Sequence, residues 1–251
     1  HAARLTLTSH ASLIPPLFNA IPTRHTNRAA YDPRPLTPEQ FAAFDALITE
    51  PDVRLFWFKD EAARAQFSAV ALAAAEALVA DEQQSLDSHE WWRQDWDQLQ
   101  ATADGVTLDA QGLGGFITGM AKFLPDISRQ QGDQTFVQNV REIMLPTASA
   151  FGILAVPNRM DNAQRLQCGR AWQRLHLWST TQGLAMQPLN QMCERDDRER
   201  QLGLEPVIGD AVRGLMGDEG WQGIMPFRVG YPIQEALPSP RRGLDKVIEE
   251  T

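Results

Sequence analysis

The alternation of apolar and polar stretches along the chain predicts a fold that contains both strands and helices. Val53–Phe58 is rich in β-branched and aromatic residues, which favour strands. Ala150–Val156 is an uninterrupted apolar run ended by Pro157, a pattern typical of a strand that is buried on both faces. The other predicted elements are strands over Arg4–Thr8 and Ile224–Tyr231 and helices over Leu13–Ile21, Thr37–Ile48, Asp60–Gln84, Thr135–Leu145, Asn162–Gly183, Pro188–Leu202 and Asp210–Met216.

Two of these helices have recognisable starts. Thr37 can cap the first, Pro38 is tolerated at the first helical position, and Gln40 can complete a capping box. Asp60 is placed to cap the alanine-rich helix that follows the strand Val53–Phe58.

Residues 88–132 differ in composition from the rest of the chain. Trp91, Trp92 and Trp96 predict a short helix, and a glycine-rich loop follows. We interpret this segment as an insertion within a single domain of residues 1–251. It fits a lid over a site, and it equally fits a tryptophan-rich contact to the core or to a partner subunit.

The overall charge and the cysteines restrict the class of protein. A chain of 251 residues can bury a large core. Its net charge of −9 argues against duplex nucleic acid, because such a surface needs a basic excess. Apolar runs fall short of the about 18 residues of a membrane span. Cys168 and Cys193 indicate no disulfide scaffold, so we expect the cytoplasm. The chain begins with His1 rather than Met, which leaves an exported location open.

The strongest candidate chemistry is in Arg24-His25-Thr26-Asn27-Arg28. Residues two apart in an extended segment point the same way, so Arg24, Thr26 and Arg28 can converge on one small anion. Guanidinium groups make paired, charge-assisted hydrogen bonds to phosphate oxygens. The side chains of His25 and Asn27 should then point elsewhere. Taken alone, the segment also fits a solvated basic turn.

Other candidate motifs fail on their spacing. Gly112–Gly115 is no nucleotide loop, because no strong strand precedes it and no Gly-Lys-Ser/Thr follows it. The five histidines are scattered, and neither cysteine has a histidine at ligand spacing. No Gly-x-Ser-x-Gly elbow is present. We therefore predict no metal site and no protein nucleophile, and we interpret His176 as a satisfied core or interface residue.

Two further segments complete a recognisable set. The first contains Gly169-Arg170-Ala171, then Gln173-Arg174, and continues through Gly183-Leu184 to Pro188. The second contains Arg228-x-Gly230-Tyr231-Pro232, followed by Pro238-x-Pro240-Arg241-Arg242. Together with Arg24-x-Thr26-x-Arg28, in this order, they make the chain resemble the nitroreductase-like flavoprotein family.

The resemblance implies an α+β fold with a mixed, largely antiparallel sheet flanked by helices, and FMN bound between two subunits or two halves. It implies that the FMN phosphate is held by Arg24, Thr26 and Arg28, with Arg241 or Arg242. It places the turn Pro188-Leu189-Asn190 beside the flavin ring, with a backbone N–H facing the flavin N5.

The chain departs from ordinary members of the family. The Asn-x-Gln-Pro-Trp segment is missing, because Ile48 runs through Thr49–Asp52 directly into the strand Val53–Phe58. Asn190-Gln191 stands where the family has Glu-Gly. The chain therefore looks most like the second half of the duplicated branch, in which a first half supplies the missing flavin contacts. The expected partner is a second copy of this chain or such a fused or associated half.

The resemblance implies an FMN-dependent oxidoreductase that takes hydride from NAD(P)H and passes electrons to a nitroaromatic or quinone-like small molecule. The alternative is a catalytically idle protein that binds or sequesters FMN, which the missing segment favours. A third possibility is an assembly partner with a vestigial phosphate site.

Overall fold

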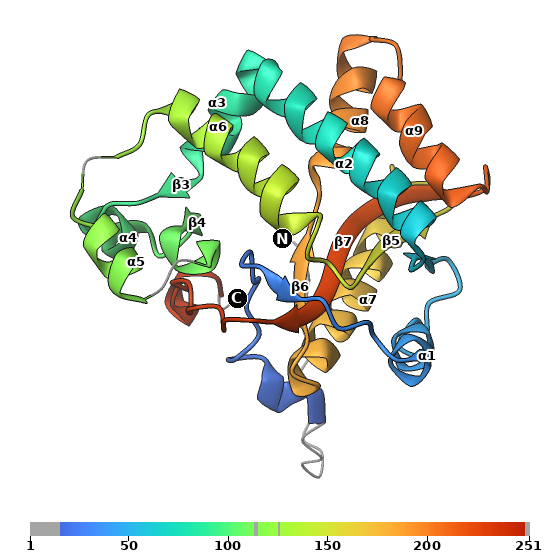
Figure 1. The fold of residues 1–251 in the computed structure, drawn as a ribbon, viewed down its shortest axis with the longest axis horizontal. Coiled ribbons are helices and arrows are strands. Elements are labelled where there is room, and N and C mark those ends of the chain that lie inside the picture. The colour runs from blue at the N-terminus through green and yellow to red at the C-terminus, as the bar shows by residue number, and fades with distance from the viewer. Residues whose placement is uncertain (1–15, 113–114, 125, 249–251) are drawn as a thin grey trace.

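The centre of the protein is an antiparallel sheet with strands in the order β1-β7-β5-β2, and with β6 also paired to β7 (Figure 1). The computed structural model describes residues 16–112, 115–124 and 126–248. Every pair in this sheet is antiparallel, and only the small two-stranded sheet of β3 and β4 is parallel. The strands are β1 Tyr31–Asp32, β2 Arg54–Phe58, β3 Trp92–Arg93, β4 Val106–Thr107, β5 Ala150–Val156, β6 Ala185–Pro188 and β7 Gln222–Pro232.

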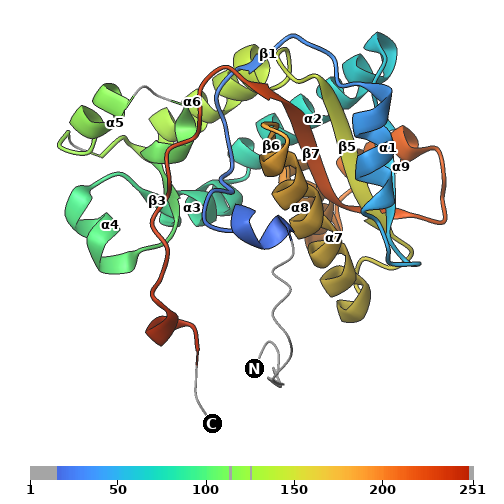
Figure 2. The same ribbon diagram turned by 90° about the horizontal axis from the view of Figure 1, so that it is seen from below.

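Helices cover both faces of this sheet, so the predicted α+β class is confirmed. Helices α2, α8 and α9 pack on one face, and α1 and α7 pack on the other (Figure 2). The helices are α1 Pro38–Ala46, α2 Glu61–Ala80, α3 Glu82–Glu90, α4 Trp96–Thr102, α5 Gly115–Ala121, α6 Arg129–Asn139, α7 Asn162–Thr181, α8 Gln191–Leu202 and α9 Val207–Met216. Short 3₁₀ helices are η1 Pro16–Ala20, η2 Leu108–Gln111 and η4 Leu244–Lys246, and η3 Val140–Met144 is a π-helix.

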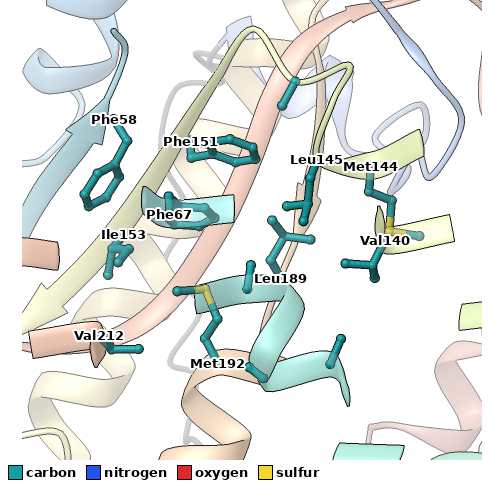
Figure 3. Packing of buried hydrophobic residues seen from close by; sticks show 14 of the residues in the cluster. Phe58, Phe67, Val140, Met144, Leu145, Phe151, Ile153, Leu189, Met192 and Val212 are labelled. Atoms are coloured by element: carbon teal, nitrogen blue, oxygen red, sulfur yellow. The ribbon is translucent and has the colours of Figure 1, made fainter. Parts of the chain in front are cut away.

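Strand β5 is buried on both sides along its whole length, as its uninterrupted apolar sequence predicts. Successive side chains of a strand point to opposite faces. Phe151 and Ile153 therefore enter the core under α2, where Phe151 stacks on Phe67 with ring centroids 4.4 Å apart (Figure 3). Leu154 and Val156 enter the second core, under α7.

Helix α2 belongs to the first of these cores. By length and composition alone its 20 residues are apolar enough to cross a membrane. In the structure its residues Phe67, Ala71, Ala74 and Ala75 are buried in the core that includes Phe151 of the sheet. The same apolar composition is therefore used here to cover one face of the sheet.

Several predicted starts and strands are confirmed. Thr37 caps α1, and its capping box with Gln40 is formed in both directions. Asp60 caps α2 through the N–H of Ala63. The predictions over Val53–Phe58, Ala150–Val156, Asn162–Gly183, Asp210–Met216 and Ile224–Tyr231 agree with β2, β5, α7, α9 and β7 to within a few residues.

The predicted helix Asp60–Gln84 is wrong in its extent, because it is two helices. The Asp81 carboxylate accepts hydrogen bonds from the N–H groups of Gln83 (3.1 Å) and Gln84 (3.2 Å). It thereby caps α3, and its extended backbone ends α2 at Ala80.

The short helix predicted to carry the three tryptophans is also wrong. Trp91 ends α3, Trp92 lies in β3, and Trp96 begins α4 after the N-cap Asp95. The carbonyl of Trp91 accepts a 2.7 Å hydrogen bond from the N–H of Val106, which pulls the chain into the β3–β4 pair. A tertiary pairing therefore overrides the local helical pattern.

The helix predicted to begin at Pro188 begins later, at Gln191. Pro188 is the last residue of β6 and lies opposite Phe227 of β7. Proline lacks an N–H but is tolerated at the end of an edge strand, which explains this position.

Two predictions concern the N-terminal region. The helix over Leu13–Ile21 is present as η1, Pro16–Ala20, and its first residues lie outside the described part of the chain. The strand over Arg4–Thr8 lies outside the described residues altogether.

Elements β3, α4, β4, η2 and α5 form a lobe beside the main sheet, to the left in Figure 1. We call the described residues 91–112 and 115–124 the tryptophan lobe. The C-terminal segment that follows β7 runs along this lobe in both views (Figures 1 and 2). This arrangement brings the lobe and the C-terminal segment to the basic segment Arg24–Arg28.

Candidate anion-binding site

The basic segment runs between η1 and β1 and lies against the edge strand β6. The N–H of Asn27 approaches the carbonyl of Met186 at 3.4 Å. Arg24, Thr26 and Arg28 line one cavity of about 270 Å³, as their alternation along the segment predicted. Arg241 from the C-terminal segment lines the same cavity, whereas Arg242 does not.

The three arginines of this cavity lack acidic partners. Across residues 16–112, 115–124 and 126–248, no carboxylate forms an ion pair with Arg24, Arg28 or Arg241. Arg241 donates instead to the carbonyls of Ile21 and Arg24, both at 3.1 Å. The guanidinium of Arg28 donates no hydrogen bond to any described residue.

The effect of this arrangement is visible in the pKa values. Burial lowers the pKa of Arg24, and the nearby charge of Arg241 lowers it further. Burial also lowers the pKa of Arg28, with Tyr31 opposing and Arg228 adding to the effect. A buried cation without a counter-charge is costly, so an anion in this cavity would be stabilised by these arginines.

His25 and Asn27 lie between the cavity-lining residues Arg24, Thr26 and Arg28. The Asn27 side chain turns away: its amide nitrogen donates to the carbonyl of Gln234 (2.7 Å), and its oxygen accepts from the N–H of Ala29 (2.9 Å). The prediction for Asn27 is therefore confirmed. His25 is also among the residues that line the cavity. Burial lowers the pKa of His25, and the charges of Arg241 and Arg24 lower it further, whereas a hydrogen bond to the backbone of Pro22 opposes this shift.

His176 on α7 contacts the basic segment through both nitrogens of its ring. Its Nδ1 lies 3.2 Å from the Arg24 guanidinium, and its Nε2 lies 3.3 Å from the carbonyl of His25. A guanidinium only donates, so Nδ1 accepts and the proton sits on Nε2. Burial and the charge of Arg24 lower the pKa of His176 to about 3, which keeps the ring neutral. The interpretation of His176 as a satisfied buried residue is confirmed, with a role in orienting Arg24.

We expect this histidine to make stability depend on pH. The unfolded chain takes up the proton near the ordinary pKa of about 6.5, whereas the folded chain resists it down to about 3. The free energy of unfolding should therefore be highest above about pH 6.5 and should fall as the pH is lowered from 7 to 4. Urea unfolding of the wild type and of His176→Gln at both ends of this range measures the effect. The variant should show a flatter pH dependence, and equal dependence in both proteins would contradict this account.

Arg228 on β7 holds the basic segment in place. Its side chain is fully buried and has no acidic partner in the described part of the chain. It donates to the carbonyls of Ala29 (2.7 Å) and Asn27 (3.4 Å). It also donates to Gln187 Oε1 (2.7 Å), the Met144 carbonyl (3.0 Å) and Thr147 Oγ1 (3.3 Å), and it lies over the Tyr31 ring at 3.9 Å.

Sequence reasoning missed the role of Arg228. The signal that was available is a single charged residue within the otherwise apolar strand Ile224–Tyr231. Such a residue is buried only when several acceptors surround it. The structure shows that these acceptors come from β6, from the residues after η3 and from the basic segment.

No protein-family model matches the chain, and no curated protein sequence matches it. Solved structures do match over nearly its whole length. An FMN-dependent nitroreductase, NfnB from Mycobacterium smegmatis, in complex with NADPH, has a TM-score of 0.57 at 18% identity, covering 93% of this chain and 96% of that chain. A nitroreductase with bound FMN from Bacteroides fragilis has a TM-score of 0.55 at 12% identity, covering 95% and 100%.

The chain has the nitroreductase fold. An NADPH:FMN oxidoreductase from Vibrio harveyi, complexed with NAD⁺, is similar as well, with a TM-score of 0.51 at 12% identity over 93% of this chain and 76% of that chain. The resemblance found in the sequence is therefore confirmed for the fold.

In this nitroreductase fold, Pro188 ends β6, and Leu189 and Asn190 connect it to α8; all three residues lie outside the anion cavity. The Leu189 side chain is buried, and its N–H donates to the Pro226 carbonyl at 2.8 Å. Leu189 therefore has no N–H to offer a ligand. The N–H of Asn190 has no acceptor among the described residues, so it is the donor left for the predicted contact to a flavin ring.

The start of α8 carries further unused polar atoms. Asn190 Oδ1 and Gln191 Nε2 are buried and have no hydrogen-bond partner in the described structure. Asn190 also lines a second, larger cavity of about 760 Å³, together with Cys193, Ile224 and Met225. Buried polar groups are normally satisfied, so these atoms mark a place that a ligand or a partner would complete.

The structure separates the two candidate C-terminal arginines. Arg241 lines the anion cavity, and Arg242 forms an ion pair with Asp104 on the tryptophan lobe. Asp104 also pairs with Arg93 at 3.3 Å. The prediction left the choice between Arg241 and Arg242 open, and this geometry favours Arg241 as the phosphate contact.

Proposed function

We propose that this protein binds FMN and acts as an FMN-dependent oxidoreductase. NAD(P)H would supply hydride, and a nitroaromatic or quinone-like small molecule would accept the electrons. The observation that carries the proposal is a cavity on a nitroreductase fold that is lined by three cations, Arg24, Arg28 and Arg241, none of which pairs with a carboxylate of a described residue. Two of the similar structures, an FMN-dependent nitroreductase in complex with NADPH and a nitroreductase with bound FMN, support this choice of cofactor and reductant.

The residues present fit the phosphate end of FMN. Phosphate carries up to two negative charges and strong acceptor oxygens, which suit three guanidiniums and the hydroxyl of Thr26. The cavity of about 270 Å³ is slightly below the range of about 300–1,000 Å³ typical of whole small-molecule sites. We therefore expect it to take the phosphate and the neighbouring chain, with the ring outside it along β6.

The start of α8 fits the ring end. Asn190 offers a free N–H, and the first N–H groups of a helix have no partner within the helix. FMN supplies a ring that accepts hydride and passes electrons on when it is bound. The part of the protein is to hold the phosphate with Arg24, Arg28 and Arg241, to orient the ring with Asn190, and to exclude water. No protein nucleophile is required.

We further propose that a second nitroreductase-like unit completes the site, either another copy of this chain or a fused or associated half. The missing Asn-x-Gln-Pro-Trp segment and the unsatisfied atoms of Asn190 and Gln191 support this proposal. We place the protein in the cytoplasm, which the free, buried Cys168 and Cys193 support.

The test of the function is steady-state oxidation of NADH and NADPH by the FMN-loaded protein, with a nitroaromatic and a quinone as acceptors. Turnover above that of the same concentration of free FMN is the expected result. Bound FMN without turnover would contradict the enzymatic function and favour an FMN-sequestering protein. Absence of FMN binding would contradict both.

A further inference from the structure

The C-terminal segment after β7 contacts two different parts of the protein through consecutive residues. Neighbouring side chains on an extended chain point in opposite directions. Arg241 accordingly reaches the carbonyls of Ile21 and Arg24, whereas Arg242 reaches Asp104 on the tryptophan lobe. The segment therefore ties the lobe to the basic segment.

The tryptophan lobe forms one wall of the anion cavity. Gly105, Val106, Thr107 and Ala110 line it together with Arg24, Thr26 and Arg28. The hydroxyl of Thr107 lies 3.4 Å from that of Ser239, a second tie between the lobe and the C-terminal segment.

The lobe also packs closely against Ala29, the residue that follows the basic segment, at Gly112. A Cβ atom on Gly112 would lie 2.5 Å from Ala29 Cα, and its φ of +75° favours glycine. The lobe is therefore pressed against the segment that carries the phosphate-binding residues. A movement of the lobe would therefore also move the phosphate-binding residues.

The carboxylate of Asp104 forms ion pairs with an arginine of the lobe and with an arginine of the C-terminal segment. Its side chain is 17% exposed and lies between Arg93, 13% exposed, and Arg242, 49% exposed. A half-buried carboxylate shared by two arginines is less screened by solvent than an isolated surface pair. Of these three residues only Arg242 belongs to the C-terminal segment. Replacing Arg242 therefore removes the ion pair between that segment and the lobe and leaves the Arg93–Asp104 pair in place.

We propose that Asp104 and Arg242 are positioning residues that latch the tryptophan lobe and the C-terminal segment together over the phosphate of the bound ligand. The latch rests on the proposed binding of FMN. It closes the outer wall of the cavity and slows the escape of a phosphate-bearing ligand. Its removal should therefore raise the dissociation rate of FMN more than it lowers the association rate.

The test is stopped-flow dissociation of FMN, followed by recovery of flavin fluorescence, from the wild type, Asp104→Asn, Arg242→Gln, Arg242→Lys and the double variant Asp104→Asn/Arg242→Gln. Losing the tie should speed dissociation about 3- to 10-fold, that is, up to about 1.4 kcal/mol. The double variant should be no faster than the faster single variant, because each single substitution already removes the Asp104–Arg242 ion pair. Arg242→Lys should restore most of the wild-type rate.

Two controls separate latching from general damage. Arg141→Gln removes a comparably exposed ion pair, to Glu76, far along the chain from the site, and should leave the rate unchanged. Riboflavin, which lacks the phosphate, should dissociate from all variants at the wild-type rate. If Asp104→Asn lowers the thermal midpoint of the ligand-free protein, the FMN dissociation rates of Arg242→Gln and Arg242→Lys test the latch in its place.

Wild-type dissociation rates in Arg242→Gln, or multiplied effects in the double variant, would overturn the latch while leaving the proposed function standing. A change in the riboflavin rate equal to that of FMN would also overturn it. A wild-type protein that does not quench FMN fluorescence would overturn the proposed function and the latch together.

Discussion

Replacing Arg28 with methionine should greatly weaken FMN binding while leaving the ligand-free protein at least as stable as the wild type. A hydrogen bond to a charged group contributes about 1.5–3 kcal/mol, so the dissociation constant for FMN should rise about 10- to 150-fold. In the ligand-free protein, Arg28 is a largely buried cation that has no acceptor among the described residues. The substitution therefore removes the desolvation cost of this charge without removing a hydrogen bond. Its thermal midpoint should stay level or rise, by about 2–4 °C for each 1 kcal/mol gained.

Fluorescence titration with FMN and thermal unfolding without ligand measure the two effects. Arg141→Met, on an exposed ion pair, is the matched control and should change neither by more than a small amount. Destabilisation of ligand-free Arg28→Met would show that Arg28 has a structural partner. Unchanged FMN affinity would remove Arg28 from the phosphate site.

Replacing Arg228 with methionine should have the opposite effect on stability. The Arg228 guanidinium donates to the carbonyls of Met144 and Ala29, and its removal leaves both without their donor. The Asn27 carbonyl loses its contact to Arg228 as well, but it keeps the hydroxyl of Tyr31 as a donor. Orphaned buried acceptors cost about 1–3 kcal/mol each, offset in part by removing the buried charge. We expect the free energy of unfolding to fall by about 2–5 kcal/mol.

The same variant should also lose FMN affinity, although Arg228 does not line the cavity. The carbonyls that it holds belong to Asn27 and Ala29, on either side of Arg28. Urea unfolding and FMN titration measure the two effects, and Arg228→Lys, which keeps the charge with fewer donors, should be intermediate. A variant as stable as the wild type would contradict the assignment of Arg228 as the anchor of the basic segment.

The pair of substitutions shows why charge alone does not determine the role of an arginine. Arg28 and Arg228 carry the same group within one part of the protein. Arg28 has no acceptor there and is available to a ligand, whereas Arg228 has its donors satisfied. The difference lies in tertiary contacts, and the sequence gives one hint of it, because Arg228 is the single charged residue of an otherwise apolar strand.

Elements with local causes could be predicted from the sequence. The capping box of Thr37 and Gln40 depends on residues three apart, and the uninterrupted apolar run of β5 reflects burial on both faces. The alternation of Arg24, Thr26 and Arg28 likewise placed these side chains on one side before any fold was known. Each of these features is set within a few residues of the chain.

Features that depend on distant partners were not predictable in this way. The local sequence predicts a helix for the tryptophans, but the pairing of β3 with β4 takes Trp92 out of helical geometry. The local sequence also predicts a helix start at Pro188, because nothing nearby shows that it ends an edge strand beside Phe227. Arg241 and Arg242 are adjacent and chemically equal, and only the position of Asp104 separates their roles.

The central claim is that the three uncompensated arginines bind the phosphate of FMN. The most direct measurement compares the binding of FMN and riboflavin to the wild-type protein at low and high salt, because the two ligands differ only in the phosphate. FMN should bind at least about tenfold more tightly, and this preference should shrink as salt screens the charges. Equal affinity for the two flavins, or a preference that does not depend on salt, would contradict the claim.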